Sequence, residues 1–188
     1  MKKFLMGLGI VVLIFVIFFS WYKNGFNNAV RKDEKVKSAW AQVENQLQRR
    51  NDLIPNLVNT VKGFATQEKS VFIEVTRLRS QWGEAKTITD KIENANSMTA
   101  ALSRLLLVAE NYPELKSNEN FLTLQSQLEG TENRIAVERM RYNQVVLELN
   151  TFRREFFGRF FVAQAGLTEA AVYFEAEEKA RQVPVVNF

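Results

Sequence analysis

Residues 4–22, FLMGLGIVVLIFVIFFSWY, constrain this chain more than any other feature, because the segment carries no charged side chain. A helix rises about 1.5 Å per residue, so a helix over this segment has the length needed to cross the roughly 30 Å hydrocarbon core of a bilayer. Trp21 and Tyr22 end the segment, and amphipathic aromatic rings favour the boundary between lipid and water. We therefore predict a transmembrane anchor over residues 1–22, with Trp21 and Tyr22 as its membrane-interface anchors.

A cleaved signal peptide is the competing interpretation of the same segment. The apolar part of a signal peptide normally spans about 7–15 residues and is followed by small residues at the cleavage site. Here the apolar run is longer and ends in Phe-Phe-Ser-Trp-Tyr. The sequence therefore favours an uncleaved, single-pass signal anchor.

The side of the membrane that carries the rest of the chain is only weakly indicated. Lys2 and Lys3 precede the apolar run, and Lys or Arg near the end of a span favours the cytoplasmic side. Five basic residues compete from the other end: Lys23, Arg31, Lys32, Lys35 and Lys37. A short basic head before an apolar run is the usual signal-anchor pattern, so we expect the domain on the extracytoplasmic side.

The chain after the anchor, residues 23–188, is long enough to form one domain with its own core. Lys and Arg total 25 in the chain and Asp and Glu total 21, with the two signs interspersed, which is not the charge pattern of a nucleic-acid-binding protein. His and Cys are absent, which excludes disulfides, thiolate or imidazole metal ligands and the commonest general base. We therefore predict no catalytic residues, no metal, no cofactor and no identifiable small-molecule substrate.

Apolar residues after the anchor recur at steps of three and four, which is the periodicity of an amphipathic helix. We expect the first helix of the domain to continue to Trp82, with a kink or local break near residues 51–55. Pro55 causes that expectation, because it lacks the N–H that would bond the Asn51 carbonyl. The apolar positions of this helix are Val36, Trp40, Val43, Leu47, Ile54, Leu57, Val61, Phe64, Val71, Val75, Leu78 and Trp82, and Arg50 falls on the same face.

Two further long helices and a short one are predicted. The second follows a polar gap at residues 83–89, is capped by Thr89 or Asp90, and ends at Pro113. The third opens at Ser117 or Asn118, and a short final helix covers residues 168–181. The apolar face of the third helix comprises Phe121, Leu124, Leu128, Ile135, Tyr142, Val145, Leu149, Phe152 and Phe156, interrupted by Thr131 and Glu138. The predicted fold class is all-α: one transmembrane helix followed by an elongated antiparallel bundle.

Four segments of the chain, in one order, resemble the LemA family. They are LQRRNDLIPNLVNTVKG at residues 47–63, YPELKSNENF at 112–121, TENRIA at 131–136 and RYN at 141–143. The resemblance implies a single-pass protein of the bacterial cytoplasmic (inner) membrane with a helical-bundle domain, and it implies no established enzymatic activity. Leu149-Asn150 and Phe156-Phe157 depart from the family's usual Tyr-Asn and Phe-Pro pairs. The resemblance therefore says least about residues 153–161.

A polar cluster is the main candidate interaction site. It comprises Arg49, Arg50, Asp52, Glu132, Arg134 and Glu138. One interpretation is a recognition site for an acidic group or a partner helix, because an Arg guanidinium holds a carboxylate in a fork. The other is an internal ion pair in which Asp52, Glu132 or Glu138 is the partner, because a buried charge must be paired whatever the protein does.

The segment RREFFGRFF, residues 153–161, alternates basic side chains with paired Phe. One interpretation is a segment that touches anionic lipid headgroups, or a surface for self-association. The other is that the Phe side chains close one end of the bundle, because aromatic residues at helical spacing usually pack inside.

The function that fits these features best is a membrane-anchored helical scaffold, not an enzyme, that binds protein partners or copies of itself. The alternative is a hydrolase, or a subunit of one, that uses only Asp, Glu and Arg chemistry. Asp52, Glu132 and Glu138 would be its candidate acids.

Overall fold

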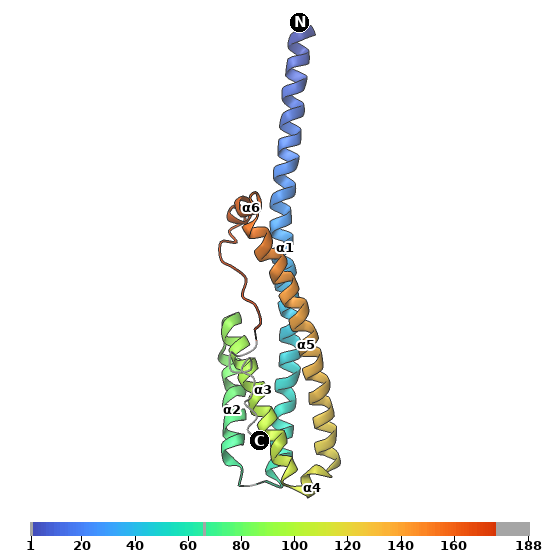
Figure 1. Cartoon of the computed structure of the whole chain (residues 1–188), viewed down its shortest axis with the longest axis vertical. Coiled ribbons are helices and arrows are strands. Elements are labelled where there is room, and N and C mark those ends of the chain that lie inside the picture. Colours follow the sequence, from blue (N-terminus) through green and yellow to red (C-terminus); the bar gives the residue numbers. More distant parts are fainter. Residues whose placement is uncertain (1, 66, 176–188) are drawn as a thin grey trace, which may run out of the picture. The chain divides into compact units, whose positions relative to one another are not determined.

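The computed structural model describes residues 2–65 and 67–175, and the elements found there are all helices (Figure 1). The predicted all-α fold is confirmed. The helices are α1 (Lys2–Lys62), α2 (Lys69–Glu84), α3 (Ile88–Glu110), α4 (Pro113–Lys116), α5 (Glu119–Arg154) and α6 (Gly158–Gln164).

The chain divides into two compact units, which are described separately. Unit 1 comprises the described residues of Met1–Trp40 and Asn143–Ala171, and unit 2 those of Ala41–Tyr142 and Val172–Phe188. Helices α1 and α5 each contribute residues to both units. The predicted boundary between residues 22 and 23 separates the expected membrane anchor from the rest of the chain. The two units are defined differently, by contacts between residues, so they do not test that boundary.

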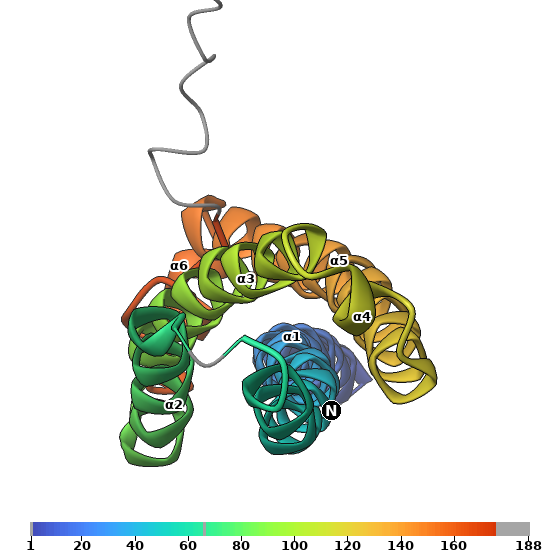
Figure 2. The ribbon, with the colours of Figure 1, turned by 90° about the horizontal axis from the view of Figure 1, so that it is seen from below.

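Unit 2 holds the larger hydrophobic core. Figure 2 shows α2, α3 and the α4–α5 segment as an arc of helices around α1. The core side chains come from all of these helices and include Ile54, Leu57, Val61, Phe72, Val75, Leu78, Met98, Leu102, Leu105, Leu115, Phe121 and Leu128. Most of these positions belong to the apolar faces read from the sequence, so the three- and four-residue spacing located most of this core.

The prediction that the first helix continues to Trp82 is wrong. Helix α1 ends at Lys62, and the carbonyl of Val61 accepts hydrogen bonds from the N–H groups of Phe64 (3.1 Å) and Ala65 (2.9 Å). The chain then reverses direction, so that α2 runs back along α1. A hydrogen bond near the end of α2 shows this: Trp82 donates from Nε1 to Gln48 Oε1 of α1 at 3.3 Å. The reversal lets the apolar face of α2 pack on that of α1, and it leaves Phe64, predicted as core, 36% exposed.

The predicted local break near residues 51–55 is not found, because α1 continues through Pro55; a kink, the other form of that prediction, stays a prediction. The proline ring removes the N–H that would bond the Asn51 carbonyl. Arg79 of α2 supplies a replacement donor: its Nε lies 3.4 Å from the Asn51 carbonyl oxygen. The backbone group that Pro55 leaves without a partner is therefore satisfied by a neighbouring helix.

Side-chain caps explain where α3 and α5 begin. Thr87, not Thr89 or Asp90, caps α3: its Oγ1 accepts from the Asp90 N–H at 3.0 Å, and Asp90 Oδ2 accepts from the Thr87 N–H at 3.3 Å. This is a capping box, so Asp90 takes part from the first turn and not from the cap position. Asn118, one of the two predicted caps of α5, is confirmed by its Oδ1, which accepts from the Phe121 N–H at 3.1 Å.

Unit 1 is built from the first part of α1, the end of α5, and α6. One cluster of its buried side chains comprises Ala29, Phe152, Phe161 and Val162. Phe156, predicted as core, is 72% exposed, because α5 ends at Arg154 and the chain turns there. The short helix near the end of the domain is α6, whereas the helix predicted for residues 168–181 is wrong over 168–175; the remainder lies outside the described residues.

The first part of α1 has the properties of a membrane-spanning segment. It is long and apolar enough to cross a bilayer, and its apolar side chains from Phe4 to Phe19 are more than half exposed. A soluble core helix would bury such side chains against protein, so their exposure suits a lipid environment.

Candidate functional site

Arg50 is the central residue of the predicted polar cluster, and only 1% of its surface is exposed. Its Nη1 donates to Thr99 Oγ1 of α3 at 2.9 Å and to Glu132 Oε1 of α5 at 3.0 Å. Its Nη2 donates to the Ala95 carbonyl of α3 at 3.1 Å. Glu132 is therefore the acidic partner among the three that the sequence left open, and one guanidinium links α1, α3 and α5.

The electrostatics of this pair follow from its burial. Burial lowers the pKa of Arg50, because a low-dielectric environment disfavours the charged form, and the negative charge of Glu132 opposes that effect. The ordinary pKa of a guanidinium is so high that Arg50 still carries its charge at neutral pH. The Glu132 side chain is 33% exposed, so water reaches one partner of the pair while the other is enclosed.

Arg139 of α5 belongs to the same electrostatic environment and was missed from the sequence. Burial lowers its pKa, Glu132 opposes the shift, and the charge of Arg50 adds to it. The Arg139 guanidinium also stacks over the Phe174 ring, 4.2 Å from the ring centroid. Its spacing of seven residues from Glu132 is a signal that was available, because two helical turns return a side chain to the same face.

The remaining residues of the predicted cluster lie elsewhere. Arg49 and Arg134 are exposed, and so is Asp52, whose Oδ1 accepts from Gln48 Nε2 at 2.8 Å. Glu138 accepts from Arg141 Nη1 at 2.7 Å. Of the six residues, the structure brings together only Arg50 and Glu132, and this geometry favours the internal-ion-pair interpretation of the cluster.

Two asparagines extend the buried polar layer of unit 2. Asn94 donates from Nδ2 to the Leu78 carbonyl at 2.8 Å, whereas its Oδ1 has no hydrogen-bond partner among the described residues. Asn51 is 3% exposed, and neither polar atom of its side chain has a partner among those residues. Buried polar groups of this kind add little stability, but they restrict which helices pack together and in which register.

Aromatic rings gather around Trp21 and Tyr22 in unit 1. The Trp21 ring contacts the rings of Phe157 and Phe161 at centroid distances of 5.3 and 5.1 Å, and the Tyr22 ring contacts Phe160 and Phe161 at 6.4 and 6.0 Å. Phe161 is 3% exposed and closes the packing of this unit, as one interpretation of residues 153–161 predicted. The other Phe side chains of the segment are exposed, so packing accounts for it only in part.

Unit 2 contains an apolar cleft of about 600 Å3 between the end of α1 and the first half of α2. Its lining residues are Lys62, Lys69, Phe72, Ile73 and Thr76. Lys62 Nζ lies 5.7 Å from the centroid of the Phe72 ring, within range of a cation–π interaction, and Ile73 is 67% exposed. The cleft thus combines apolar side chains with two positive charges.

An apolar helix of membrane-spanning length, followed by a helical bundle, defines a membrane-associated, all-helical protein. The model of the LemA family matches residues 39–188, which is most of the chain, so this protein belongs to the LemA family. The resemblance read from the four segments is therefore confirmed.

Relatives from three bacteria are similar to the chain. It is 25% identical over 205 residues to magnetosome protein MamQ 2 of Paramagnetospirillum magneticum, covering 95% of this chain and 74% of the relative. It is 20% identical over 171 residues to protein LemA of Metamycoplasma hominis, covering 90% and 78%. It is 26% identical over 162 residues to magnetosome protein MamQ of Magnetospirillum gryphiswaldense, covering 72% and 60%.

Proposed function

We propose that this protein is a membrane-anchored scaffold, not an enzyme, and that it binds a protein partner in the cleft between α1 and α2. The observation that carries the proposal is the apolar lining of that cleft, in which Ile73 is 67% exposed and the Phe72 side chain, 3% exposed, joins the lining to the core. Scattered apolar side chains are normal on a protein surface, whereas an apolar cleft with polar edges is typical of an interaction site.

The side chains of the cleft define the chemistry of its partner. Lys62 and Lys69 supply positive charge beside Phe72 and Ile73, and none of the described residues that line the cleft is acidic. An amphipathic helix with acidic residues next to apolar anchors would satisfy both features: its apolar side chains would fill the cleft and its carboxylates would meet the lysines. A second copy of the chain is the alternative occupant that the experiment below distinguishes.

The membrane placement is part of the same proposal. Residues 1–22 would form a single-pass anchor in the bacterial cytoplasmic membrane and residues 23–188 the interaction domain, on the extracytoplasmic side. The charge-free segment and the basic residues before it support this arrangement. No specific observation among the described residues favours the hydrolase alternative, since Asp52, Glu132 and Glu138 do not share a site.

The proposal is tested by site-specific photocrosslinking of the full chain in native membranes. A photoreactive residue at position 73 should form an adduct with a distinct protein, and the charge reversals Lys62→Glu and Lys69→Glu should abolish that adduct. The matched control is position 140, because Met140 is equally exposed at 68% and does not line the cleft. Equal labelling at both positions, or an adduct of two copies of this chain, would contradict the proposed partner.

A further inference from the structure

The turn between α5 and α6 exposes three aromatic side chains. Phe156 is 72% exposed, Phe157 is 56% exposed and Phe160 is 46% exposed, although all three lie within five residues of one another. The rings of Phe156 and Phe157 are in contact at a centroid distance of 4.9 Å, and Phe160 exposes a third ring three residues later in unit 1. Such a surface needs a partner that shields it from water.

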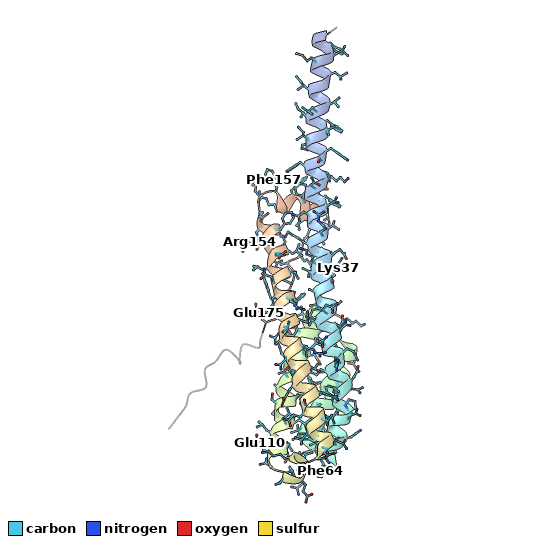
Figure 3. The ribbon with its side chains drawn as sticks, turned by 90° about the vertical axis from the view of Figure 1, so that its right-hand side faces the viewer. Lys37, Phe64, Glu110, Arg154, Phe157 and Glu175 are labelled. Atoms are coloured by element: carbon cyan, nitrogen blue, oxygen red, sulfur yellow. The ribbon has the colours of Figure 1, made fainter. Side chains whose placement is uncertain are left out.

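The level of this turn along α1 is fixed by ring contacts within unit 1. Phe157 packs edge-on against Trp21, and Phe160 packs against Tyr22. Figure 3 shows Phe157 beside α1 and Arg154, the last residue of α5, a little below it. The turn therefore lies beside the end of the charge-free segment, at the level where Trp and Tyr mark the boundary of a bilayer.

Gly25 permits this close packing. A Cβ atom at residue 25 would overlap the Phe161 ring, so a larger residue there would require that ring to move. The lack of a side chain at this one position lets the turn approach the anchor helix closely, one turn beyond Trp21.

Basic side chains flank the exposed rings in the sequence. Arg154 and Arg159 are exposed, Arg153 is partly buried, and Glu155 is the single acidic residue of the turn. The Arg159 guanidinium lies 5.5 Å from the centroid of the Phe156 ring. Aromatic rings between long basic side chains suit the lipid interface, where the rings enter the headgroup region and the guanidinium groups reach lipid phosphates.

We propose that the α5–α6 turn, residues 154–160, is a second membrane-contact site that binds the anionic surface of the bilayer in which α1 is anchored. Phe156, Phe157 and Phe160 enter the headgroup region, and Arg154 and Arg159 bind lipid phosphates. The bilayer is the occupant, not another copy of the chain, because the turn packs directly on the residues that end the membrane-spanning segment. This inference rests on the proposed anchor and is independent of the partner cleft.

The chain contains no Cys, so a single introduced thiol can carry an environment-sensitive fluorophore without background labelling. The probes are the full-length variants Phe156→Cys, Leu147→Cys and Phe15→Cys, reconstituted in phosphatidylcholine vesicles with and without phosphatidylglycerol. Leu147 is the matched control because it is also an exposed apolar residue of unit 1, 49% exposed, but lies further from the turn along α5. Phe15 reports on the anchor itself.

Quenchers attached to lipid should reduce the fluorescence of the label at residue 156 severalfold more than that at residue 147, and phosphatidylglycerol should increase the difference. The additional substitutions Arg154→Gln and Arg159→Gln should remove the effect of phosphatidylglycerol, while an unchanged far-UV circular dichroism spectrum shows that the helices are intact. If the effect of phosphatidylglycerol persisted, the role of these arginines would be contradicted. Equal quenching at 156 and 147, with 15 quenched, would overturn this inference alone. Energy transfer between labels at residue 156 on two copies of the chain, without quenching by lipid, would show self-association and would also overturn the inference. If lipid did not quench a label at residue 15, the proposed anchor would be refuted as well.

Discussion

Replacing Glu132 by Gln should destabilise unit 2 more than replacing Arg50 by Met. Glu132→Gln keeps the shape of the side chain but removes the negative charge beside a guanidinium that is 1% exposed. Removing one partner of a fully buried ion pair costs about 3–5 kcal/mol, because the other charge is left without compensation. Since the Glu132 side chain is 33% exposed and Arg50 keeps two neutral acceptors, we expect a loss of about 1–3 kcal/mol.

Arg50→Met removes the buried charge itself and leaves few unsatisfied groups. The Thr99 hydroxyl keeps its bond to the Ala95 carbonyl at 3.1 Å, and Glu132 is exposed enough to be hydrated. A methionine side chain fills much of the volume, so we expect a change of less than about 1.5 kcal/mol. In the double variant, the Met substitution should recover most of the stability that Glu132→Gln removes.

Urea unfolding of the full chain in mild detergent, followed by far-UV circular dichroism, measures these differences. Arg49→Met is the matched control, because it changes the preceding residue of the same type at an exposed position, and it should alter the free energy of unfolding by less than about 0.5 kcal/mol. If Glu132→Gln behaved like that control while Arg50→Met lost several kcal/mol, packing and not charge would explain the buried arginine, and the reasoning would be refuted.

Three further predictions use other features of the fold. Gly25→Ala should weaken the packing of α6 on α1, seen as faster amide exchange in α6, whereas Gly83→Ala, where an added Cβ meets nothing within 4 Å, should not. Burial raises the pKa of Tyr142 to about 12, whereas the side chain of the unfolded chain titrates near pH 10. The stability that depends on the neutral phenol should therefore be complete below pH 10 and fall as the pH rises towards 12. The variant Tyr142→Phe should lack this loss of stability in alkaline unfolding. Arg79→Met should cost about 1 kcal/mol in urea unfolding of the native chain but almost nothing together with Pro55→Ala, which restores the helical N–H; equal costs in both backgrounds would contradict the proposed compensation.

The sequence predicted which residues are buried better than it predicted where helices end. Val61, Phe64 and Val71 continue the helical spacing across the region where α1 stops, so the periodicity contains no sign of the reversal. The reversal is favoured by packing of α2 on α1, which involves residues far apart in the chain. Phe64 is exposed as a consequence, because it lies in the connection and not on a helix face.

Pro55 shows a second limit of local reasoning. Its missing N–H predicts a break when only neighbouring residues are considered. The donor that replaces it belongs to Arg79, 28 residues later, and no sequence pattern connects the two. A local rule was therefore overridden by a tertiary hydrogen bond.

The candidate site was predictable as a position but not as a pair. Arg50 falls on the apolar face of α1, so its burial and its need for a partner follow from the sequence. Its partner Glu132 is 82 residues away, and choosing it over Asp52 and Glu138 requires the packing of α5. The burial of Asn51 was not predicted, because this residue lies just off the apolar face read from the spacing.

The central claim, a chain held in the membrane by its apolar first segment, is tested most directly by alkaline carbonate extraction of native membranes, followed by intact-mass analysis of the recovered protein. The account predicts that the chain stays in the membrane pellet with residues 1–22 still attached. Recovery in the soluble fraction of a chain that begins after Tyr22 would contradict it.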